Sequence, residues 1–209
     1  MSARGRRTAA ATAGRVIAGS ARGIRLSAAG PTVRPLGDRL KEALFAILEP
    51  ELPGAAFLDL CAGTGAGGIE ALSRGAESAT LVDAAQAAVE AISRNLGVAH
   101  LAGPSARVVR ADALEWLASG APASPPFDVI LVDPPYDRPE LLLAILERIG
   151  GAAGRHAGRG ILAADGVLVA KHATRTSLPS PIGLLASARE RRFGESTLTF
   201  YRWSDAEGR

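Results

Sequence analysis

The stretch that decides the fold is Ala55-Ala-Phe-Leu-Asp59-Leu-Cys-Ala-Gly63-Thr-Gly65-Ala-Gly67-Gly68-Ile-Glu70. Its first six residues are apolar apart from Asp59 and predict a buried strand over 55–60. A glycine-rich turn follows, and the residues after it predict a helix over about 66–74. Glycines at such a turn let the backbone bend tightly and approach a ligand where a Cβ atom would collide. This order of elements is typical of a nucleotide-binding α/β fold.

Strand and helix patterns alternate along the rest of the chain. Further strands are predicted over 78–83, 106–110, 127–132 and 166–171, helices over about 84–96, 112–118 and 139–149, and a terminal hairpin from about 185–192 and 196–203. Near-continuous apolar strands separated by helices are typical of a parallel sheet covered on both faces. We therefore predict a Rossmann-like α/β domain over about 46–209, with a mostly parallel seven-stranded sheet that ends in an antiparallel hairpin.

Residues 1–45 predict a basic extension of this domain. A short hairpin is expected over 15–19 and 22–27, then an extended segment between two prolines, then a helix over about 39–49 with Asp38 as its N-cap. Residues 1–42 carry nine bases and two acids, whereas the rest of the chain carries 15 bases and 19 acids. This asymmetry predicts a polyanionic partner. For residues 1–13 the simpler alternative is a solvated, unstructured tail.

Composition excludes several classes of protein. A chain of 209 residues and 21.4 kDa suits one domain with a sizeable core. It has no apolar run long enough to span a membrane and no apolar segment after its basic start, so we expect neither a membrane helix nor a secretory signal. Cys61 is the sole cysteine, which fits a reduced, cytoplasmic setting and a small buried filler. We expect no metal site, because no histidines or cysteines have ligand spacing, and nothing demands more than a monomer.

The glycine turn leaves two cofactor classes open. Gly63, Gly65 and Gly68 satisfy the G-x-G-x-x-G pattern, so a nicotinamide dinucleotide and an oxidoreductase must be considered. A pyrophosphate prefers a helix N-terminus without carboxylates nearby, but Asp59 lies just before this turn. S-adenosylmethionine (SAM) carries a sulfonium and an ammonium, which a carboxylate stabilises. Asp59 therefore favours SAM.

Two further acids follow the next strands. Asp83 ends the second strand of the domain and can accept hydrogen bonds from both ribose hydroxyls, although it could also cap the helix that follows. Asp112 follows the third strand and could accept from an adenine amino group, or cap the helix over 112–118. We expect the cofactor to contact these acids, Ala113 and the turn residues Ala62, Gly63, Thr64, Gly65 and Gly68.

Asp133-Pro134-Pro135-Tyr136 directly follows the apolar strand over 127–132. Ligands of open α/β sheets bind beyond the carboxyl ends of strands, so this motif is expected beside Asp59 and Asp83. Two prolines make the segment rigid and remove backbone donors, leaving the Asp133 carboxylate and the Pro134 carbonyl as acceptors for an exocyclic amino group. Tyr136 offers a face for stacking on a base. The four residues predict methylation of an aromatic amine, driven mainly by positioning and electrostatics.

These motifs resemble SAM-dependent class I methyltransferases that act on amino groups of nucleic acids. More narrowly, the chain resembles the RsmD family, bacterial guanine-N2 methyltransferases of 16S ribosomal RNA, over about residues 14–203. The closer match is carried by Arg15-Val-Ile-Ala-Gly-Ser-Ala-Arg-Gly-Ile-Arg-Leu, by Arg34-Pro-Leu-Gly-Asp-Arg-Leu-Lys-Glu-Ala-Leu-Phe and by Phe193-Gly-Glu-Ser-Thr-Leu-Thr-Phe-Tyr.

The resemblance implies SAM at the glycine turn, Asp83 at the ribose, Asp112 near the adenine, and Asp133 to Tyr136 around a guanine of 16S rRNA, free or within the small subunit. It also implies that the N-terminal hairpin and helix entry hold RNA or close over the cofactor. The chain departs from the family pattern at Leu36-Gly37, at Asp83 in place of Glu, and at Lys171-His172, where an acid is frequent.

Some roles stay open at this stage. RNA contacts are expected from Arg15, Arg22, Arg25, Arg34 and Arg39, but Arg34, Asp38 and Arg39 could equally form a helix cap and a surface ion pair. The segment 150–160 is expected to be a solvated linker. Methylation of adenine N6 or cytosine N4, and RNA binding without catalysis, remain alternatives.

Overall fold

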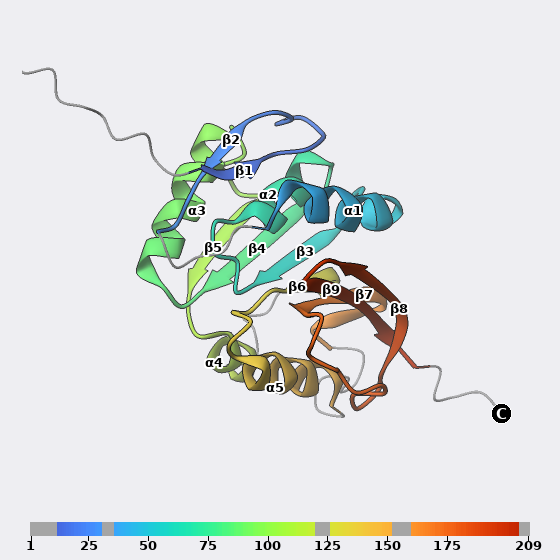
Figure 1. Ribbon diagram of the computed structural model, residues 1–209. Helices are drawn as coiled ribbons and strands as arrows, with labels where there is room; N and C mark the ends of the chain where they lie inside the picture. Colours follow the sequence, from blue (N-terminus) through green and yellow to red (C-terminus); the bar gives the residue numbers. More distant parts are fainter. Residues whose placement is uncertain (1–11, 31–35, 120–125, 152–159, 205–209) are drawn as a thin grey trace, which may run out of the picture.

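We analysed a computed structural model of the chain, which describes residues 12–30, 36–119, 126–151 and 160–204. Seven strands form one sheet in the order β5-β4-β3-β6-β7-β9-β8 (Figure 1). The first five strands in this order are parallel, and β9 and β8 complete the sheet in antiparallel pairing. The strands are β3 (Ala56–Leu60), β4 (Ser78–Asp83), β5 (Ala106–Arg110), β6 (Phe127–Val132), β7 (Leu162–Ala173), β8 (Leu185–Phe193) and β9 (Ser196–Trp203). The predicted fold class and strand count are confirmed.

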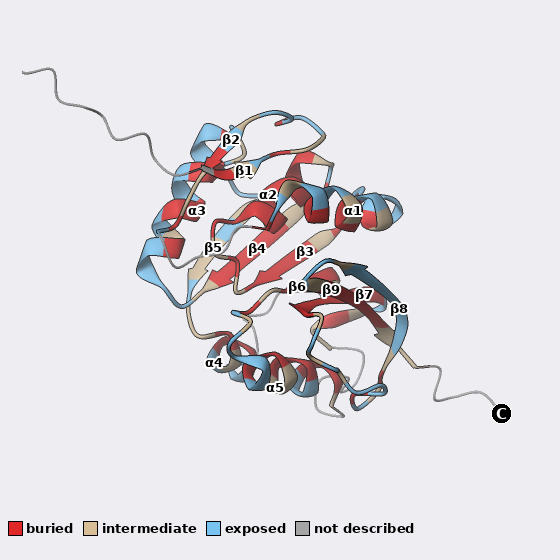
Figure 2. Cartoon of the chain, in the orientation of Figure 1, coloured by how far each residue is buried: buried red, intermediate tan, exposed pale blue. Residues whose placement is uncertain are grey.

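Helices cover both faces of the sheet. One face is covered by α1 (Asp38–Leu48), α2 (Ala66–Ser73) and α3 (Gln86–Val98), the other by α4 (Ala113–Ala118) and α5 (Pro139–Gly150), and a short 3₁₀ helix, η1 (Glu49–Glu51), follows α1. Along β6, Val129 and Leu131 belong to one hydrophobic cluster, whereas Ile130 and Val132 belong to the other. Burial on both faces explains why the strands are continuous apolar runs (Figure 2). In the described part of the chain, no helix has the length and apolarity needed to cross a bilayer.

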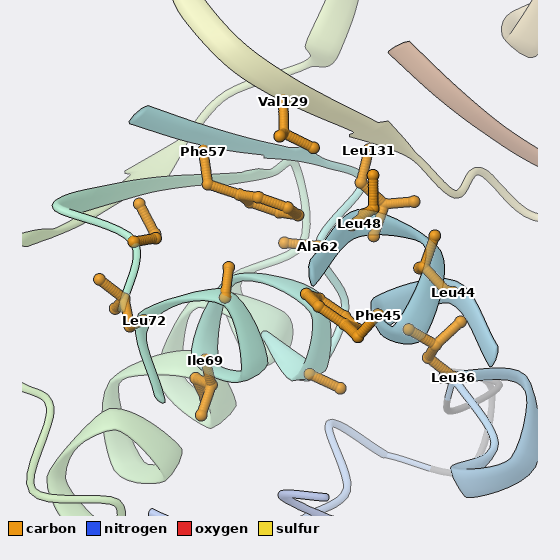
Figure 3. Close-up of a cluster of buried hydrophobic side chains, with 14 of the residues drawn as sticks. Leu36, Leu44, Phe45, Leu48, Phe57, Ala62, Ile69, Leu72, Val129 and Leu131 are labelled. Atoms are coloured by element: carbon orange, nitrogen blue, oxygen red, sulfur yellow. The ribbon is translucent and has the colours of Figure 1, made fainter. Parts of the chain in front are cut away.

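The largest cluster joins α1 to the central strands. Leu44, Phe45 and Leu48 of α1 are buried in the same cluster as Phe57 of β3, as Figure 3 shows. The rings of Phe45 and Phe57 are stacked with centroids 6.1 Å apart. The guanidinium of Arg74, at the end of α2, lies 5.4 Å from the Phe45 ring centroid. These contacts fix α1 on the sheet, so the first turn of α1 keeps a constant place relative to the strand ends.

The N-terminal hairpin is present but shorter than expected. Its strands are β1 (Thr12–Arg15) and β2 (Arg25–Ser27), not 15–19 and 22–27. The cause lies in α2, because the backbone N–H groups of Ile17 and Ala18 donate to the Glu70 carboxylate at 2.8 and 3.0 Å. The N–H of Ser20 donates to the Ser73 carbonyl at 2.8 Å. Groups bound to a helix cannot also pair in a strand, so tertiary contacts override the local β propensity.

Glu70 is the buried centre of this attachment. Its side chain is fully buried, as is that of Lys41 from α1, and the Lys41 Nζ lies 3.7 Å from Glu70 Oε2. Arg74 adds a 2.8 Å contact with Glu70 Oε1. Burial lowers the pKa of Lys41, and the Glu70 carboxylate opposes that change. One carboxylate therefore joins the N-terminal segment, α1 and α2.

Three other element predictions need correction. Asp38 is not the N-cap of α1, because Gly37 takes that position and the Asp38 carboxylate instead accepts from the Arg15 N–H at 3.2 Å. β7 begins four residues before the expected strand over 166–171 because its start pairs with Phe127. α3 begins at Gln86 and not at 84. Other predictions concern residues outside the described ranges. These are the tail over 1–11, the segment that holds Pro31, Arg34 and Pro35, and most of the linker over 150–160.

We predict that Gly19→Ala destabilises the protein more than Gly23→Ala. Both glycines have positive φ, +81° and +86°, so alanine at either costs about 1–3 kcal/mol in backbone strain. A Cβ atom on Gly19 would also lie 1.7 Å from the Ser73 carbonyl oxygen, whereas one on Gly23 meets nothing within 4 Å. Urea unfolding of both variants measures the difference, and equal losses would contradict the close approach to α2.

Candidate active site

A hollow of about 710 Å³ opens at the carboxyl ends of the parallel strands. Its wall contains the four carboxylates singled out in the sequence, Asp59 of β3, Asp83 of β4, Asp112 before α4 and Asp133 after β6. The volume is typical of a site for a small molecule. The structure thus brings together residues that are far apart in the chain, because parallel strands end at one edge of the sheet.

The glycine turn forms one side of the hollow. Of its predicted cofactor contacts, Ala62, Gly63 and Thr64 line the hollow, while Gly65 and Gly68 do not. Gly65 is the N-cap of α2 with φ +77°, a left-handed conformation that favours glycine. A Cβ atom on Gly68 would lie 2.7 Å from the Leu81 side chain. These two glycines therefore shape the turn and pack α2 against the sheet behind the hollow.

Asp59 lies at the base of the turn. Its side chain accepts a hydrogen bond from the Gly68 N–H at 2.9 Å, and the residue is 2% exposed. Burial raises the pKa of Asp59 to about 8; the Gly68 hydrogen bond opposes this rise, and the charges of Asp133 and Asp83 add to it. A cationic group in the hollow would favour the ionised carboxylate.

Asp83 and Asp112 both bind backbone N–H groups. Asp83 accepts from Gly63 at 2.8 Å and from Ala85 at 2.9 Å, but the N-cap of α3 is Ala85, so Asp83 does not cap that helix. Asp112 does cap α4, accepting from Leu114 at 2.9 Å. Each carboxylate oxygen has two lone pairs. Both acids, and Ala113 beside Asp112, therefore still line the hollow with acceptors to offer a ligand.

The Asp-Pro-Pro-Tyr segment forms the opposite side. Asp133 Oδ1 lies 2.5 Å from the Nζ of Lys171, a residue of β7 that is 5% exposed. The same Nζ lies 4.5 Å from the Tyr136 ring centroid. The Tyr136 hydroxyl donates to Ser196 Oγ at 2.6 Å, which fixes the ring against the start of β9. A carboxylate and an aromatic ring are thus held side by side, as the motif predicts.

Lys171 and Asp133 form an ionised pair. Burial raises the pKa of Asp133, and the Lys171 ammonium opposes that rise. Burial alone would lower the pKa of Lys171, but Asp133 and Tyr136 together outweigh burial and raise that pKa. We assign the charges as carboxylate and ammonium, because such short contacts are typical of charge-assisted hydrogen bonds. Sequence reasoning missed this contact, although a lysine at the end of an apolar strand was a visible signal.

Other wall residues were also missed. Arg138 and Arg175 are exposed at the hollow and were not among the predicted contacts. Cys61, expected to be a buried filler, is half-buried in the wall with φ +62°. Burial raises the pKa of its thiol to about 12, so it stays neutral and is a poor nucleophile. In the described ranges, no group of three or more acidic, histidine or cysteine side chains is placed to hold a metal.

The arginines predicted to contact RNA lie elsewhere. Arg15, Arg22 and Arg25 are exposed on the N-terminal extension and do not line the hollow. Arg39, in the first turn of α1, lines a second hollow next to the first. Arg34 is outside the described residues.

A family model described as "Conserved hypothetical protein 95" matches residues 14–202. The chain belongs to this family. Within it, YlbH of Bacillus subtilis, named provisionally as an rRNA methyltransferase, is 36% identical over 191 residues, which are 90% of this chain and 98% of YlbH. Ribosomal RNA small subunit methyltransferase D of Escherichia coli K12 is 41% identical over 125 residues, 59% of this chain and 61% of that protein. The resemblance to the RsmD family is confirmed.

A solved structure resembles this chain over almost its full length. The structure of a hypothetical protein from Thermus thermophilus has a TM-score of 0.74 and 31% identity, and the match covers 90% of this chain and 98% of that one. The similarity therefore extends over nearly the whole fold, including the strand ends that carry the hollow.

We predict that Asp59→Asn changes the pH dependence of stability. The ordinary pKa of 3.8 rises to about 8 on folding, so the folded protein binds the proton more tightly than the unfolded chain. Protonation of Asp59 therefore adds to the free energy of unfolding. This contribution is full below about pH 4 and is lost as the pH rises to about 8. The asparagine amide oxygen can still accept from Gly68 but does not titrate. Urea unfolding from pH 5 to 9 should show that the free energy of unfolding of the variant rises relative to that of the wild type as the pH rises. A difference in free energy that stays constant with pH would contradict the raised pKa.

Proposed function

We propose that this protein transfers a methyl group from SAM to the exocyclic N2 amino group of a guanine in 16S ribosomal RNA. The observation that carries the proposal is that a carboxylate and an aromatic ring, Asp133 and Tyr136, share one hollow with Asp59 and Asp83. The name of the E. coli relative supports ribosomal RNA of the small subunit as the substrate. The chemistry of the hollow supports methyl transfer independently of that name.

The residues present fit SAM better than a nicotinamide dinucleotide. Carboxylates line the hollow, and a pyrophosphate would be repelled by them. Asp59 would face the ammonium of the cofactor, Asp83 the ribose hydroxyls and Asp112 the adenine amino group. When bound, SAM supplies an electrophilic methyl on a sulfonium and leaves as S-adenosylhomocysteine.

The chain's own residues would prepare the amine. An aromatic amine is a weak nucleophile because its lone pair is delocalised into the ring. The Asp133 carboxylate and the Pro134 carbonyl would accept hydrogen bonds from its two N–H groups. The nitrogen would then become pyramidal, and its lone pair could face the methyl group. A nitrogen–carbon bond forms, the carbon–sulfur bond breaks, and the product amine then releases one proton. Tyr136 holds the base by stacking, worth about 1–3 kcal/mol.

Lys171 is a positioning residue for this reaction. An ionised Asp133 accepts a hydrogen bond from the amine more strongly than a protonated one does, so the proposed reaction favours the carboxylate. Burial favours protonation of Asp133, and the Lys171 ammonium at 2.5 Å counteracts it. Lys171 therefore favours the ionised form of Asp133, which is the stronger acceptor.

Mass spectrometry of 16S rRNA tests the proposed function directly. Cells lacking this protein should lose one N2-methylguanosine, which the wild-type gene restores and Asp133→Ala does not, because that variant lacks the acceptor for the amine. Calorimetry with SAM should show that Asp133→Ala still binds the cofactor. Loss of a methyl from adenine N6 or cytosine N4 would overturn the guanine assignment, and an unchanged rRNA would overturn the function.

We predict that Lys171→Met moves the pH profile of methyl transfer. Without the ammonium the pKa of Asp133 rises further, so the rising limb of kcat/KM against pH should move to higher pH. If that pKa rises by about one, the rate at pH values below it falls about tenfold, and activity recovers at higher pH. Lys171→Arg, which keeps a cation, is the matched control. If Lys171→Met lowers the rate equally at every pH, its role is only structural.

A further inference from the structure

A second hollow of about 640 Å³ adjoins the first. Tyr136 and Lys171 line both hollows and form the wall between them. Ser196 accepts a hydrogen bond from the Tyr136 hydroxyl at 2.6 Å, and it lines the second hollow but not the first. A ligand that extends from the first hollow past Tyr136 therefore enters the second. The proposed function leaves this space unused.

The second hollow lies between the first turn of α1 and the turn that joins β8 to β9. Arg39 comes from the helix and Arg192 from the strand, and both side chains are exposed. Two arginines from elements that are far apart in the chain therefore line one space.

The charge of Arg39 has no structural explanation within the described chain. It lies in the first turn of α1, where the helix dipole disfavours a cation. Among the described residues it forms no ion pair, because the acid beside it, Asp38, binds Arg15 instead. Asp38 and Glu195 also line the hollow, but within the described chain no ion pair joins either of them to Arg39. A cation that the helix dipole disfavours and that lacks such a partner points to an external anion.

Arg192 is also available to a ligand. Its Nε lies 2.9 Å from Glu190, but both side chains are exposed, at 70% and 45%. Such surface pairs contribute little to stability, so a phosphate can compete with the carboxylate. The next residue, Phe193, is half-buried in the wall of the hollow and offers an aromatic side chain.

We propose that the second hollow binds the RNA nucleotide next to the target guanine, with its phosphate between Arg39 and Arg192 and its base against Phe193. The inference rests on the proposed function and adds the course of the RNA strand. Enzymes that modify a base turn it out of the stack, so the neighbouring nucleotide must cross the rim of the target site. Guanidinium groups bind phosphate through paired hydrogen bonds, and aromatic rings stack on any base.

A phosphate-linked nucleotide fits these observations better than an acidic protein segment. The hollow joins the target site through Tyr136, and a strand that places a base there carries its next phosphate at a fixed, short distance. A protein carboxylate has no such link to the target base. The aromatic side chain beside the cations is likewise a feature of single-stranded nucleic-acid sites.

The test compares Arg39→Ala and Arg192→Ala with Arg94→Ala, a control at an exposed arginine of α3 that lines neither hollow. Binding of a 16S rRNA transcript is measured at several salt concentrations, and SAM binding by calorimetry. We expect each hollow variant to weaken RNA binding about 3- to 10-fold and to reduce the slope of log K against log salt by about 0.7, the value for one lost contact to a single strand. The control should change neither quantity, and SAM affinity should stay the same in all three.

A further variant tests the aromatic contact. Phe193→Leu keeps an apolar side chain in the wall and should weaken RNA binding at least about fivefold with an unchanged salt slope, because it removes stacking but no charge. Unchanged RNA affinity in Arg39→Ala and Arg192→Ala, or an equal loss in Arg94→Ala, would overturn the site. If the wild type transfers no methyl to rRNA, the proposed function fails, and these binding measurements still decide the second hollow separately.

Discussion

The hydrogen bond from the Gly68 N–H to the Asp59 carboxylate is the constraint on which the rest of the site depends. It joins the end of β3 to the first turn of α2, deep enough that the carboxylate is almost excluded from water. So close an approach requires that residue 68 has no side chain, because Leu81 occupies the space where a Cβ atom would lie. With α2 seated this way, the Gly63 N–H reaches Asp83, and the turn presents its backbone to the hollow.

The site follows from a division of charge that the fold imposes. Parallel strands deliver acids to one edge of the sheet, and burial opposes the ionisation of two of them, Asp59 and Asp133. Lys171 from β7 stabilises the negative charge of one of them, Asp133. A cationic cofactor would stabilise the negative charge of Asp59 on the other side of the hollow. Exposed arginines lie away from these acids, on the N-terminal extension, at the rims of the two hollows and on β8.

Sequence alone predicted the α/β class, the seven strands and the meeting of four acids, because apolar periodicity and strand ends are local signals. It could not predict that Lys171 meets Asp133, since that contact joins residues 38 positions apart across two strands. It placed the N-terminal strands wrongly because the partners of Ile17 and Ala18 are side-chain oxygens of Glu70, not a neighbouring strand. It assigned Gly65 and Gly68 to the cofactor, but neither lines the hollow; a left-handed φ favours glycine at 65, and packing against Leu81 requires it at 68.

Strand β8 lies at one edge of the sheet, where β9 is its one neighbour among the described strands of that sheet. Six of its residues in a row are exposed, and four of these, Arg189 to Arg192, are charged. An open strand edge normally invites another copy of the same chain to add to the sheet and begin aggregation. Here the charges make that docking unfavourable, so the edge can stay open to solvent without pairing with the same edge of another copy of the chain.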